Sequence, residues 1–571
     1  MSEKIIVLKF GGSVLRSEDD LPRAVHEIYR HWRRGSRIVA VVSALGNTTD
    51  ELIGKAKRYG TDPNPGALAS LLLTGEATSS ALLALALDRS GIPTKILSAE
   101  QAGIRTSGDI LDAEPVAADT ARITKELCNA VVVVSGFAGV NDSGDLTLLG
   151  RGGSDYTALF LAKQLDARCV LIKDVEGLYE SDPAKKNRPR RFAQASYATT
   201  QRCGAVLVQE KALRFAEKHD LHFEIAAFGC DSGTKIGNFS DNFASDARKR
   251  NPIRVALLGC GTVGGGVYQR LSELPELFEI TGVVNLDPKK ALAGGIDKRH
   301  IAQSATELIE TYCDIVIELI GGIEPARTHI EHALKLKRHV ITANKALLAT
   351  AGENLRRLAE EHGVTLRYSA SVGGALPALE AVAQAAVSKT ESIVGIINGT
   401  CNFICDQLAS GVDFDAAVRL AQTEGFAEAD PTLDLNGTDA AQKIILLARE
   451  TFGVNLPLSS VDREGIDSLN PADVRTALKN GQAYRLIAEC RRTVKGVTAS
   501  VKPVAFPVSH PFAQTRGAEN CLVIKSEDGK RRLLRGRGAG RYATTEAVIA
   551  DLLDFRNTAD AQNLNYKEAA A

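Results

Sequence analysis

Short apolar runs separated by amphipathic stretches recur along both halves of this chain of 571 residues. In the first half, the runs at 5–8 and 131–134 predict buried strands, and residues 77–86 between them predict a helix. In the second half, the runs at 254–258 and 314–317 repeat the pattern. Strands that are apolar at every position are typical of parallel sheets covered by helices on both faces. The chain is therefore predicted to be an α/β protein with two such regions.

A polar segment lies between the two regions and predicts a linker. The last residues of the chain are also polar, which predicts a flexible tail. We expect a first α/β domain, the linker, a second α/β domain interrupted by an α+β domain, and the tail. The first domain covers 1–237 and the linker 238–252. The second α/β domain covers 253–377 plus 534–555, and the inserted α+β domain covers 378–533. The tail covers 556–571.

The composition indicates a large globular protein that acts on small molecules. Lysine plus arginine and aspartate plus glutamate both number 69, which leaves no basic excess for nucleic acid or anionic lipid. Hydrophobic residues make up 44% of the chain, enough for a sizeable core. The ten cysteines lack a metal or redox spacing, which indicates reduced thiols. The chain starts directly with a strand and no apolar run is expected to span a membrane, so we expect a cytoplasmic protein.

The segment 425–443 concentrates acidic residues directly before an apolar run. Asp439 and Lys443 are four positions apart, so on a helix they lie one turn apart on the same face. An isolated pair of this kind is most often a salt bridge at a helix start, here with Asn436 or Thr438 as the cap. The apolar run that follows favours a different interpretation, in which an acid and a base are carried into an interior.

The loop before this pair adds three more acids, Glu428, Asp430 and Asp434. So many carboxylates near an interior need an amine ligand or buried lysines to offset their charge. The segment resembles the substrate-binding signature of homoserine dehydrogenase. In that family the acids hold the amino group of homoserine or aspartate semialdehyde, and one lysine moves the proton that accompanies hydride transfer. The resemblance assigns the first role to Glu428, Asp434 and Asp439 and the second to Lys443.

A glycine-rich turn at 259–264 follows one strand and precedes a helical stretch at 267–271. Glycine lets the backbone approach a pyrophosphate, and the helix start offers unpaired N–H groups. A plain tight turn would have the same glycines, but the strand before it and the helix after it favour a dinucleotide site. The expected cofactor contacts are Gly259, Gly261, Thr262, Val263 and Gly264.

The ribose of the cofactor is expected at the end of the following strand, residues 280–284. That strand ends at Asn285 rather than at an acid, and Asp287, Lys289 and Lys290 come next. An acid favours the free ribose hydroxyl of NAD, whereas lysines favour the 2′-phosphate of NADP. Both cofactors stay open, with the lysines favouring NADP.

Other segments of the second half also resemble homoserine dehydrogenase. Residues 314–325 resemble the strand and turn beneath its nicotinamide. Residues 342–348 resemble the loop with its second active-site lysine, which assigns catalysis to Lys345 and cofactor binding to Asn344. The substrate-side turn of the family matches Asn398, Gly399 and Thr400.

Residues 368–377 resemble the stretch of that family whose backbone carbonyls hold a monovalent cation. The resemblance places this metal at Val372 and Gly374, although many relatives have glutamate where this chain has Ser369. Residues 536–551 resemble the closing segment that returns to the nucleotide domain. The resemblance covers residues 253 to about 555.

The first half has a signature of its own at 149–158, where Arg151 and Asp155 lie in a glycine-rich turn before a helical stretch. Such a turn suits an anionic substrate beside a phosphate. A glycine-rich loop with a capping aspartate is the structural alternative. Together with Lys9 and the turn at 11–13, the signature resembles aspartate kinase, of the amino-acid kinase fold.

The resemblance to aspartate kinase implies a site for ATP with Mg²⁺ and for aspartate. Lys9 would stabilise the transferring γ-phosphoryl group, and Asp155 would organise lysine and substrate. The phosphates would be cradled by Gly11, Gly12 and Ser13. The aspartate-side positions match Ser43, Thr49, Glu76 and Arg151, and the ATP-side positions match Asp174 and Tyr179.

The first half departs from the aspartate kinase pattern in several places. Lys173 stands where the family usually has threonine, and Ala184 where it has arginine. A later nucleotide-binding lysine of the family is missing near residues 205–207. Relatives carry regulatory ACT domains after the kinase, but the segment between Gly237 and Ile253 is too short to fold one.

The resemblances imply an amino-acid-kinase fold followed by a Rossmann dinucleotide-binding domain with an α+β substrate and dimerisation domain. They imply a bifunctional enzyme of threonine, methionine and isoleucine biosynthesis, which phosphorylates aspartate and reduces aspartate semialdehyde to homoserine. Its partners would be these small molecules and, since the dehydrogenase family is dimeric, further copies of the chain. In one alternative, the kinase half is a degenerate scaffold. In another, the chain is a nucleotide-sensing binding protein, against which the intact set of acids and lysines argues.

Overall fold

The computed structural model describes residues 5–60, 62–184, 189–204, 207–244, 251–311, 313–386 and 389–558. The chain divides into two compact units, residues 1–250 and 251–571. Four expectations fall wholly or partly outside the described residues. They concern the chain start (1–4), the missing kinase lysine (205–206), the linker (245–250) and the tail (559–571).

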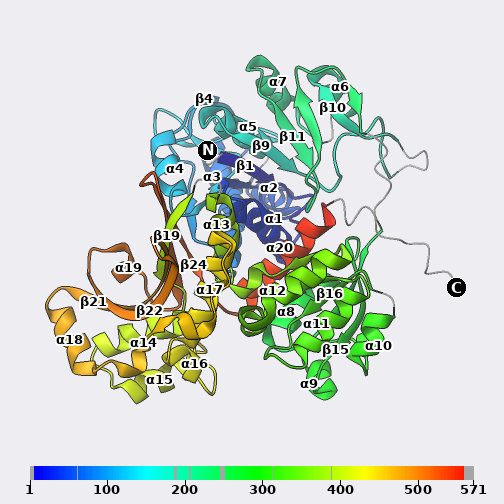
Figure 1. The fold of residues 1–571 in the computed structure, drawn as a ribbon. Helices are drawn as coiled ribbons and strands as arrows, with labels where there is room; N and C mark the ends of the chain where they lie inside the picture. The colour runs from blue at the N-terminus through cyan, green and yellow to red at the C-terminus, as the bar shows by residue number, and fades with distance from the viewer. Residues whose placement is uncertain are drawn as a thin grey trace. The chain divides into compact units, whose positions relative to one another are not determined.

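The first unit is built on a nine-stranded sheet, drawn in blue to teal in Figure 1. Its strands are β1 (Ile5–Phe10), β2 (Arg37–Val42), β3 (Thr94–Leu97), β6 (Val131–Ser135), β9 (Arg168–Ile172), β10 (Phe192–Ser196), β11 (Phe223–Ala226), β12 (Thr234–Gly237) and β13 (Asn242–Phe243). Their order is β13-β10-β12-β11-β9-β1-β2-β6-β3. The strands from β11 and β9 through β1, β2 and β6 to β3 run parallel. The predicted parallel α/β architecture of the first half is confirmed.

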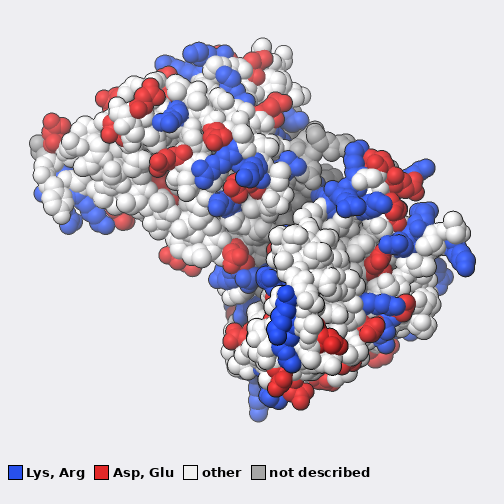
Figure 2. Space-filling model, turned by 90° about the vertical axis from the view of Figure 1, so that its left-hand side faces the viewer, with Lys and Arg blue, Asp and Glu red and all other residues white. Residues whose placement is uncertain are grey.

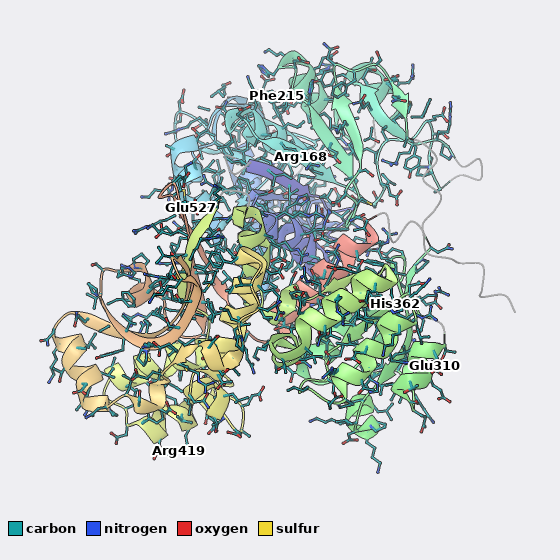
Figure 3. All side chains as sticks on the ribbon, in the orientation of Figure 1. Arg168, Phe215, Glu310, His362, Arg419 and Glu527 are labelled. Atoms are coloured by element: carbon teal, nitrogen blue, oxygen red, sulfur yellow. The ribbon has the colours of Figure 1, made fainter. Side chains whose placement is uncertain are left out.

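Helices and a small second sheet complete this unit. The helices are α1 (Leu21–Arg33), α2 (Thr48–Ala56), α3 (Pro65–Arg89), α4 (Thr120–Leu127), α5 (Gly153–Gln164), α6 (Tyr197–Cys203) and α7 (Glu210–Lys218). The small sheet has the order β5-β4-β7-β8, from β4 (Arg105–Asp109), β5 (Asp112–Ala117), β7 (Ala138–Val140) and β8 (Leu146–Leu148). Helices α4, α5 and α7 share one apolar core with the central strands. Phe215 of α7, labelled in Figure 3, lies 5.1 Å from Tyr156 of α5 between ring centroids.

The expectation that no apolar run is long enough to span a membrane was wrong for helix α3. The 25 residues of α3 are long and apolar enough to cross a membrane, by length and composition only. The helix contacts α1, α2 and β6. It also buries the polar side chains of Glu76, Ser79 and Ser80 inside the unit. These contacts make α3 a core helix of the first unit, and core helices can be as long and apolar as membrane spans.

Strand β13 lies inside the segment 238–252 that was expected as a linker. It pairs antiparallel with β10, and the ring of Phe243 stacks on Phe192 with centroids 4.5 Å apart. An aromatic residue in this polar stretch thus extends the first sheet by one strand. The first unit therefore continues beyond residue 237.

The second unit begins with a five-stranded parallel sheet, drawn in green in Figure 1. Its strands are β14 (Ile253–Leu258), β15 (Phe278–Val284), β16 (Ile315–Glu318), β17 (His339–Thr342) and β18 (Leu366–Arg367), in the order β15-β14-β16-β17-β18. Its helices are α8 (Thr262–Ser272), α9 (Pro288–Ala293), α10 (Ala305–Glu310), α11 (Ala326–Lys335), α12 (Lys345–His362) and α20 (Arg541–Arg556). The last helix, α20, returns from the end of the chain to pack on α8 and β17.

A six-stranded sheet and its helices are inserted before α20. The strands are β19 (Thr390–Ile396), β20 (Asp462–Arg463), β21 (Gln482–Thr493), β22 (Gly496–Pro507), β23 (Glu519–Ser526) and β24 (Arg531–Arg537), in the order β20-β22-β21-β19-β23-β24. The helices are α13 (Ala378–Ala386), α14 (Gly399–Ala409), α15 (Phe414–Thr423), α16 (Thr432–Leu435), α17 (Thr438–Phe452), α18 (Pro471–Lys479) and α19 (Pro511–Gln514). Helix α17 packs on α12, α13 and the strands β19, β21 and β22. It therefore lies where the parallel and antiparallel parts of this unit meet.

Surface charge is mixed in sign. Figure 2 shows lysine and arginine interspersed with aspartate and glutamate on the face it presents, in keeping with a formal net charge of zero.

All ten cysteines are free, and seven of them are buried.

Candidate active sites

Helix α17 brings the predicted acid and base together in the second unit. Lys443 Nζ donates to Asp439 Oδ2 at 2.8 Å and to the carbonyl of Ile397 at 2.9 Å. Lys345, at the start of α12, approaches the other oxygen of the same carboxylate, with Nζ 3.0 Å from Asp439 Oδ1. Asp439 and Lys443 are buried, whereas the Lys345 side chain is 38% exposed. The carboxylate therefore holds two ammonium groups, one in the interior and one facing solvent.

The start of α17 differs from the expected cap. Gly437, with φ of 77°, occupies the N-cap position, and no side chain caps the helix there. The Asn436 side chain accepts from the Thr438 N–H at 3.0 Å, which closes the turn before the helix. The left-handed conformation at residue 437 favours glycine, so Asn436 and Thr438 flank the cap and do not form it.

Asn398 links this pair to a second carboxylate. Its Nδ2 donates to Asp434 Oδ1 at 2.7 Å and to Asp439 Oδ2 at 2.8 Å. Its Oδ1 accepts from the N–H of Cys401 and caps α14. All polar atoms of the amide are therefore engaged, and Asp434 and Asp439 are held side by side.

The other residues of the substrate-side turn shape the backbone. The Thr400 hydroxyl donates to the carbonyl of Phe426 at 2.5 Å, which ties α14 to the acidic loop. A side chain at Gly399 would press on the backbone of Ala518, with its Cβ 2.8 Å from the carbonyl oxygen. Gly399 thus lets β23 approach the site closely.

Charge and burial set the proton affinities of this cluster. Burial alone would raise the pKa of Asp439, but the ammonium groups of Lys443 and Lys345 outweigh it and hold that pKa far below its usual range. Asp439 in turn raises the pKa of Lys345. Burial, together with the charge of Asp439, raises the pKa of Asp434. The result is an ionised Asp439 between two lysines, beside a second acid, Asp434, whose ionised form a cationic partner would stabilise.

Glu428 lies at the rim of this cluster. Its side chain is exposed, and its charge contributes, after Asp439 and Asp434, to the raised pKa of Lys345. Asp430 is also exposed and accepts from Thr432. Of the four acids in the segment, Asp434 and Asp439 form the interior of the cluster, and Glu428 faces its opening.

The glycine turn after β14 fits a pyrophosphate. Gly259 has φ of 93°, and a Cβ there would lie 2.6 Å from the carbonyl carbon of Leu319. A Cβ at Gly264 would collide with the carbonyl of Gly259. By contrast, Gly261 has open space around its Cβ position, and it caps α8 with no side-chain hydrogen bond. Helix N–H groups at Thr262, Val263 and Gly264 therefore face a space that a phosphate can enter.

In the first unit, Lys9 and Asp155 meet as predicted. Lys9 Nζ lies 2.7 Å from Asp155 Oδ1, and both side chains are buried. Asp155 is in the first turn of α5, whose N-cap is Gly152 with φ of 77°. Lys173, which was not predicted as a site residue, donates to the other oxygen of Asp155 at 3.0 Å. Burial opposes ionisation of Asp155, but Lys173 and Lys9 together lower its pKa.

The turn after β1 and the buried Glu76 lie beside this cluster. Gly11, Gly12 and Ser13 lead into a turn in which the carbonyl of Gly11 accepts from Val14 and Leu15. A Cβ at Gly11 would lie 2.6 Å from Lys9 Nζ, so the lysine runs along the backbone of this turn. Burial raises the pKa of Glu76 to about 8, although the N–H of Ala44 and the charge of Lys9 act against this.

The remaining positions predicted for the kinase site lie farther out. Ser43 and Thr49 are half-buried, and the Ser43 N–H donates to the carbonyl of Phe10. Arg151 and Asp174 are exposed, and Tyr179 is half-buried. No hydrogen bond between described residues joins these side chains to the carboxylate of Asp155.

Sequence profiles of three families match this chain. "Homoserine dehydrogenase, NAD binding domain" matches residues 259–369, and "Homoserine dehydrogenase" matches 377–553. The chain is 36% identical over 314 residues to the homoserine dehydrogenase of Lactococcus lactis, which covers 53% of this chain and 73% of that protein. The chain belongs to the homoserine dehydrogenase family. Its first unit matches "Amino acid kinase family" over residues 4–226 and is thus a kinase domain fused to the dehydrogenase.

Two further relatives agree with this assignment. The homoserine dehydrogenase of Bacillus subtilis is 33% identical over 312 residues, which are 53% of this chain and 72% of that protein. The crystal structure of a homoserine dehydrogenase from Thiobacillus denitrificans aligns with a TM-score of 0.51 at 35% identity. It covers 53% of this chain and 73% of its own. The predicted fold class, with amino-acid-kinase, Rossmann and substrate regions in that order, is confirmed.

In the dehydrogenase unit, Glu318 holds the loop after β16, which lies beside the glycine turn. No role for Glu318 was predicted from the sequence. This fully buried carboxylate accepts from the N–H of Ile320 at 2.7 Å and from the Thr342 hydroxyl at 2.6 Å. Asn344 donates to the carbonyl of Gly322 at 2.6 Å and caps α12. Asn344 was predicted to bind the cofactor, and its side chain binds the loop after β16.

At the end of β15, where the sequence predicts the ribose, Asp287 is bound by its own helix. Its carboxylate accepts from the N–H groups of Lys289 and Lys290 as the N-cap of α9. Asn285 donates to the carbonyl of Asp287. The lysine side chains are exposed. One oxygen of this acid is therefore bound to the backbone, whereas both lysine side chains face solvent.

The carbonyls predicted to hold a cation lie in a turn with two left-handed glycines. Val372 follows a short 3₁₀ helix, and Gly374 has φ of 54° with Gly538 packed against it. Ser369, where relatives have glutamate, donates its hydroxyl to Asp551 of α20 at 2.8 Å. Among the described residues, no group of histidine, cysteine, aspartate and glutamate side chains could hold a metal ion.

Proposed function

We propose that the second unit catalyses the reversible reduction of aspartate semialdehyde to homoserine with NAD(P)H, and that the first unit phosphorylates aspartate with ATP. The observation that carries the dehydrogenase proposal is the carboxylate of Asp439 between Lys345 and Lys443, beside Asp434. This cluster offers an acid for a substrate ammonium and a protonated lysine for a substrate oxygen.

The lysine cluster is suited to move a proton at the substrate oxygen. An ammonium group has three donors, and Lys443 uses two of them on Asp439 and on the carbonyl of Ile397. We propose that the third donates to the aldehyde oxygen, so that a proton reaches this oxygen while a hydride reaches the carbon. The product is homoserine, in which the aldehyde has become an alcohol. Asp439 holds the ammonium group of Lys443 in place, and Lys345 adds a second positive charge near the developing alkoxide.

The substrate amino group fits the acidic side of the cluster. Asp434 is held by Asn398, and burial beside Asp439 has raised its pKa, so a cationic partner stabilises its ionised form. Glu428 at the rim would pair with the same ammonium group. These contacts would orient the aldehyde carbon toward the cofactor.

The cofactor supplies or accepts the hydride, and the residues present fit it. The open space at Gly261 and the uncapped start of α8 would take the pyrophosphate. We propose NADP as the preferred form, because Asp287 is committed to α9 while Lys289 and Lys290 are exposed. The test is the initial rate of homoserine oxidation with each cofactor. A higher kcat/KM with NAD would contradict the preference.

The kinase proposal rests on Lys9 and Asp155 beside the 11–13 turn. Lys9 would neutralise charge on the transferring phosphoryl group while an oxygen of the aspartate β-carboxylate attacks the γ-phosphorus. We also propose Arg151, Ser43 and Thr49 as the aspartate side and Asp174 and Tyr179 as the nucleotide side of this site. Aspartyl phosphate trapped with hydroxylamine is the readout, and Lys9→Ala should abolish it.

One alternative function remains specific enough to test. In it, the kinase domain is a scaffold, since Lys173 and Ala184 depart from the aspartate kinase pattern. If the purified chain oxidises homoserine but forms no aspartyl phosphate at any aspartate or MgATP concentration, this alternative replaces the kinase proposal.

We further propose that the protein is a soluble, cytoplasmic homo-oligomer. Light scattering of the purified chain would give the mass of the assembly.

The domain limits and the cation are proposals of the same kind. We propose residues 253–377 plus 534–555 as the nucleotide-binding domain and 378–533 as the substrate and dimerisation domain. The return of α20 to α8 supports the first range. Binding of a monovalent cation at Val372 and Gly374 predicts that dehydrogenase activity rises with added K⁺ or Na⁺.

A further inference from the structure

Lys173 is a buried lysine at the proposed phosphoryl-transfer site of the first unit. It directly follows β9, which pairs in parallel with β1 so that Leu171 lies opposite Lys9 and Ile172 opposite Phe10. The carboxyl ends of parallel neighbours reach the same edge of a sheet. Lys9 and Lys173 therefore both reach Asp155, at 2.7 Å and 3.0 Å from different oxygens of its carboxylate.

The charge of this cluster is unbalanced in the unliganded protein. Lys9, Lys173 and Asp155 are each less than 9% exposed, and two ammonium groups face one carboxylate. Glu76, the other buried acid nearby, has its pKa raised to about 8 by burial, so it is mostly protonated at neutral pH. Asp174 acts on Lys173 through its charge but is itself exposed.

An excess buried charge is costly unless a ligand neutralises it. Lys9 runs along the glycine turn at Gly11, and Asp155 lies in the first turn of α5 after Gly152. Both features suit an anionic group with phosphate oxygens. An anion bound between the two ammonium groups would balance the cluster.

Lys173 also has donors to spare. Among the contacts of the described residues, its Nζ donates only to the two oxygens of Asp155, at 3.0 and 3.3 Å. Lys173 shares this carboxylate with Lys9. Burial lowers the pKa of Lys173, and the charge of Asp155 acts against this shift.

We propose that Lys173 is a second catalytic lysine, which contacts the transferred phosphoryl group together with Lys9. This inference rests on the kinase function proposed above. As the bond forms between an aspartate β-carboxylate oxygen and the γ-phosphorus, the bond to the bridging oxygen of ADP breaks. No net proton is exchanged. Lys9 and Lys173 hold equatorial oxygens of the phosphoryl group from two sides, and Asp155 keeps the two ammonium groups apart.

The test is the rate of aspartyl phosphate formation by Lys173→Met in the full-length chain. Loss of a charge that acts on the transition state should lower kcat by about 10²-fold or more, with the KM for MgATP changed far less. Lys125→Met, an exposed lysine on α4, is the matched control and should stay at the wild-type rate. Lys173→Arg, which keeps the charge, should recover part of the loss.

Folding of the variants can be followed within the same unit. Trp32 on α1 is the single tryptophan of the chain, so its fluorescence reports the kinase domain alone. If the Lys173→Met variant melts at a lower temperature than wild type, the assays are run below its melting transition. A Lys173→Thr variant with an unshifted melting curve then replaces Lys173→Met in the assay.

The outcomes separate this inference from the kinase function on which it rests. If the wild-type chain forms aspartyl phosphate and Lys173→Met stays within about threefold of its kcat, the role of Lys173 is overturned and the kinase stands. A wild-type chain that forms none under any condition overturns both. Loss of kcat in Lys173→Met, partial recovery in Lys173→Arg and an unchanged Lys125→Met support the inference.

Discussion

Lys345 and Asp439 form an ion pair of 3.0 Å, although their helices cover different sheets. Lys345 begins α12, which packs in the parallel part of the dehydrogenase unit, and Asp439 is in the first turn of α17, beside the antiparallel sheet. The pair therefore joins the side of the molecule that would hold the cofactor to the side that would hold the substrate. The proposed catalysis at this cluster would depend on both parts keeping their positions.

We predict that Lys345→Met lowers kcat for homoserine oxidation by about 10²-fold or more, because positive charge beside the developing alkoxide is lost. NADPH should still bind with a Kd close to wild type, since the glycine turn lies between β14 and the start of α8, away from α12. Stopped-flow kinetics and a fluorescence titration with NADPH give the two values. Lys335→Met, an exposed lysine of α11, is the control, and equal losses in both variants would contradict a specific role for Lys345.

We predict that Asp439→Asn destabilises the dehydrogenase unit. It leaves Lys443 buried without its carboxylate, and breaking a buried pair in this way costs about 3–5 kcal/mol. Chemical denaturation followed by circular dichroism at neutral pH gives the change. Asp473→Asn, at an exposed position of α18, should change stability by less than about 0.5 kcal/mol. Equal midpoints for the two variants would mean that the Asp439 carboxylate is not needed to hold Lys443.

Glu428→Gln tests the rim of the substrate site. A charge-assisted hydrogen bond is worth about 1.5–3 kcal/mol, so loss of the charge should raise the KM for homoserine by roughly 10-fold or more while kcat changes little. Glu424→Gln, an exposed acid on the same loop, serves as the control. A KM unchanged from wild type would show that Glu428 faces solvent in the complex as well.

The acid–lysine pair on α17, Asp439 and Lys443, was predictable from the sequence because helical spacing alone places the two side chains together. Asp439 and Lys443 are one turn apart in any helix, and the apolar run after them requires burial. The glycine turn at 259–264 was predictable for a similar reason, since its strand, turn and helix are contiguous. Both are local features.

Contacts between distant segments were not predictable in this way. Lys345 was assigned by family resemblance, but its ion pair with Asp439 depends on how α12 packs on α17. Lys173 appeared only as a departure from the family pattern. A signal was present, because Lys9 and Lys173 both end runs of apolar residues that parallel pairing places side by side. The strand β13 was hidden in a polar segment because a single aromatic residue, Phe243, fixes it to the sheet.

Glu76 gives the kinase domain a pH-dependent stability. Its folded pKa of about 8 exceeds the ordinary value of 4.5, so between these values the folded state holds a proton that the unfolded state has lost. Stability should therefore fall as pH rises from 5 to about 8. Glu76→Gln should remove that part of the fall, as read from melting curves of Trp32 fluorescence. Parallel pH profiles for variant and wild type would contradict the buried, protonated Glu76.

The most direct test of the account is the reaction of Lys443→Met with homoserine. Lys443 is the buried proton donor in the proposed mechanism, and it does not touch the glycine turn. We predict that homoserine-dependent reduction of NADP falls by at least about 10²-fold, while NADPH binds as in wild type. Lys479→Met, an exposed lysine of α18, should turn over normally. Turnover of Lys443→Met within a fewfold of wild type, with the variant folded, would contradict the proposed proton transfer.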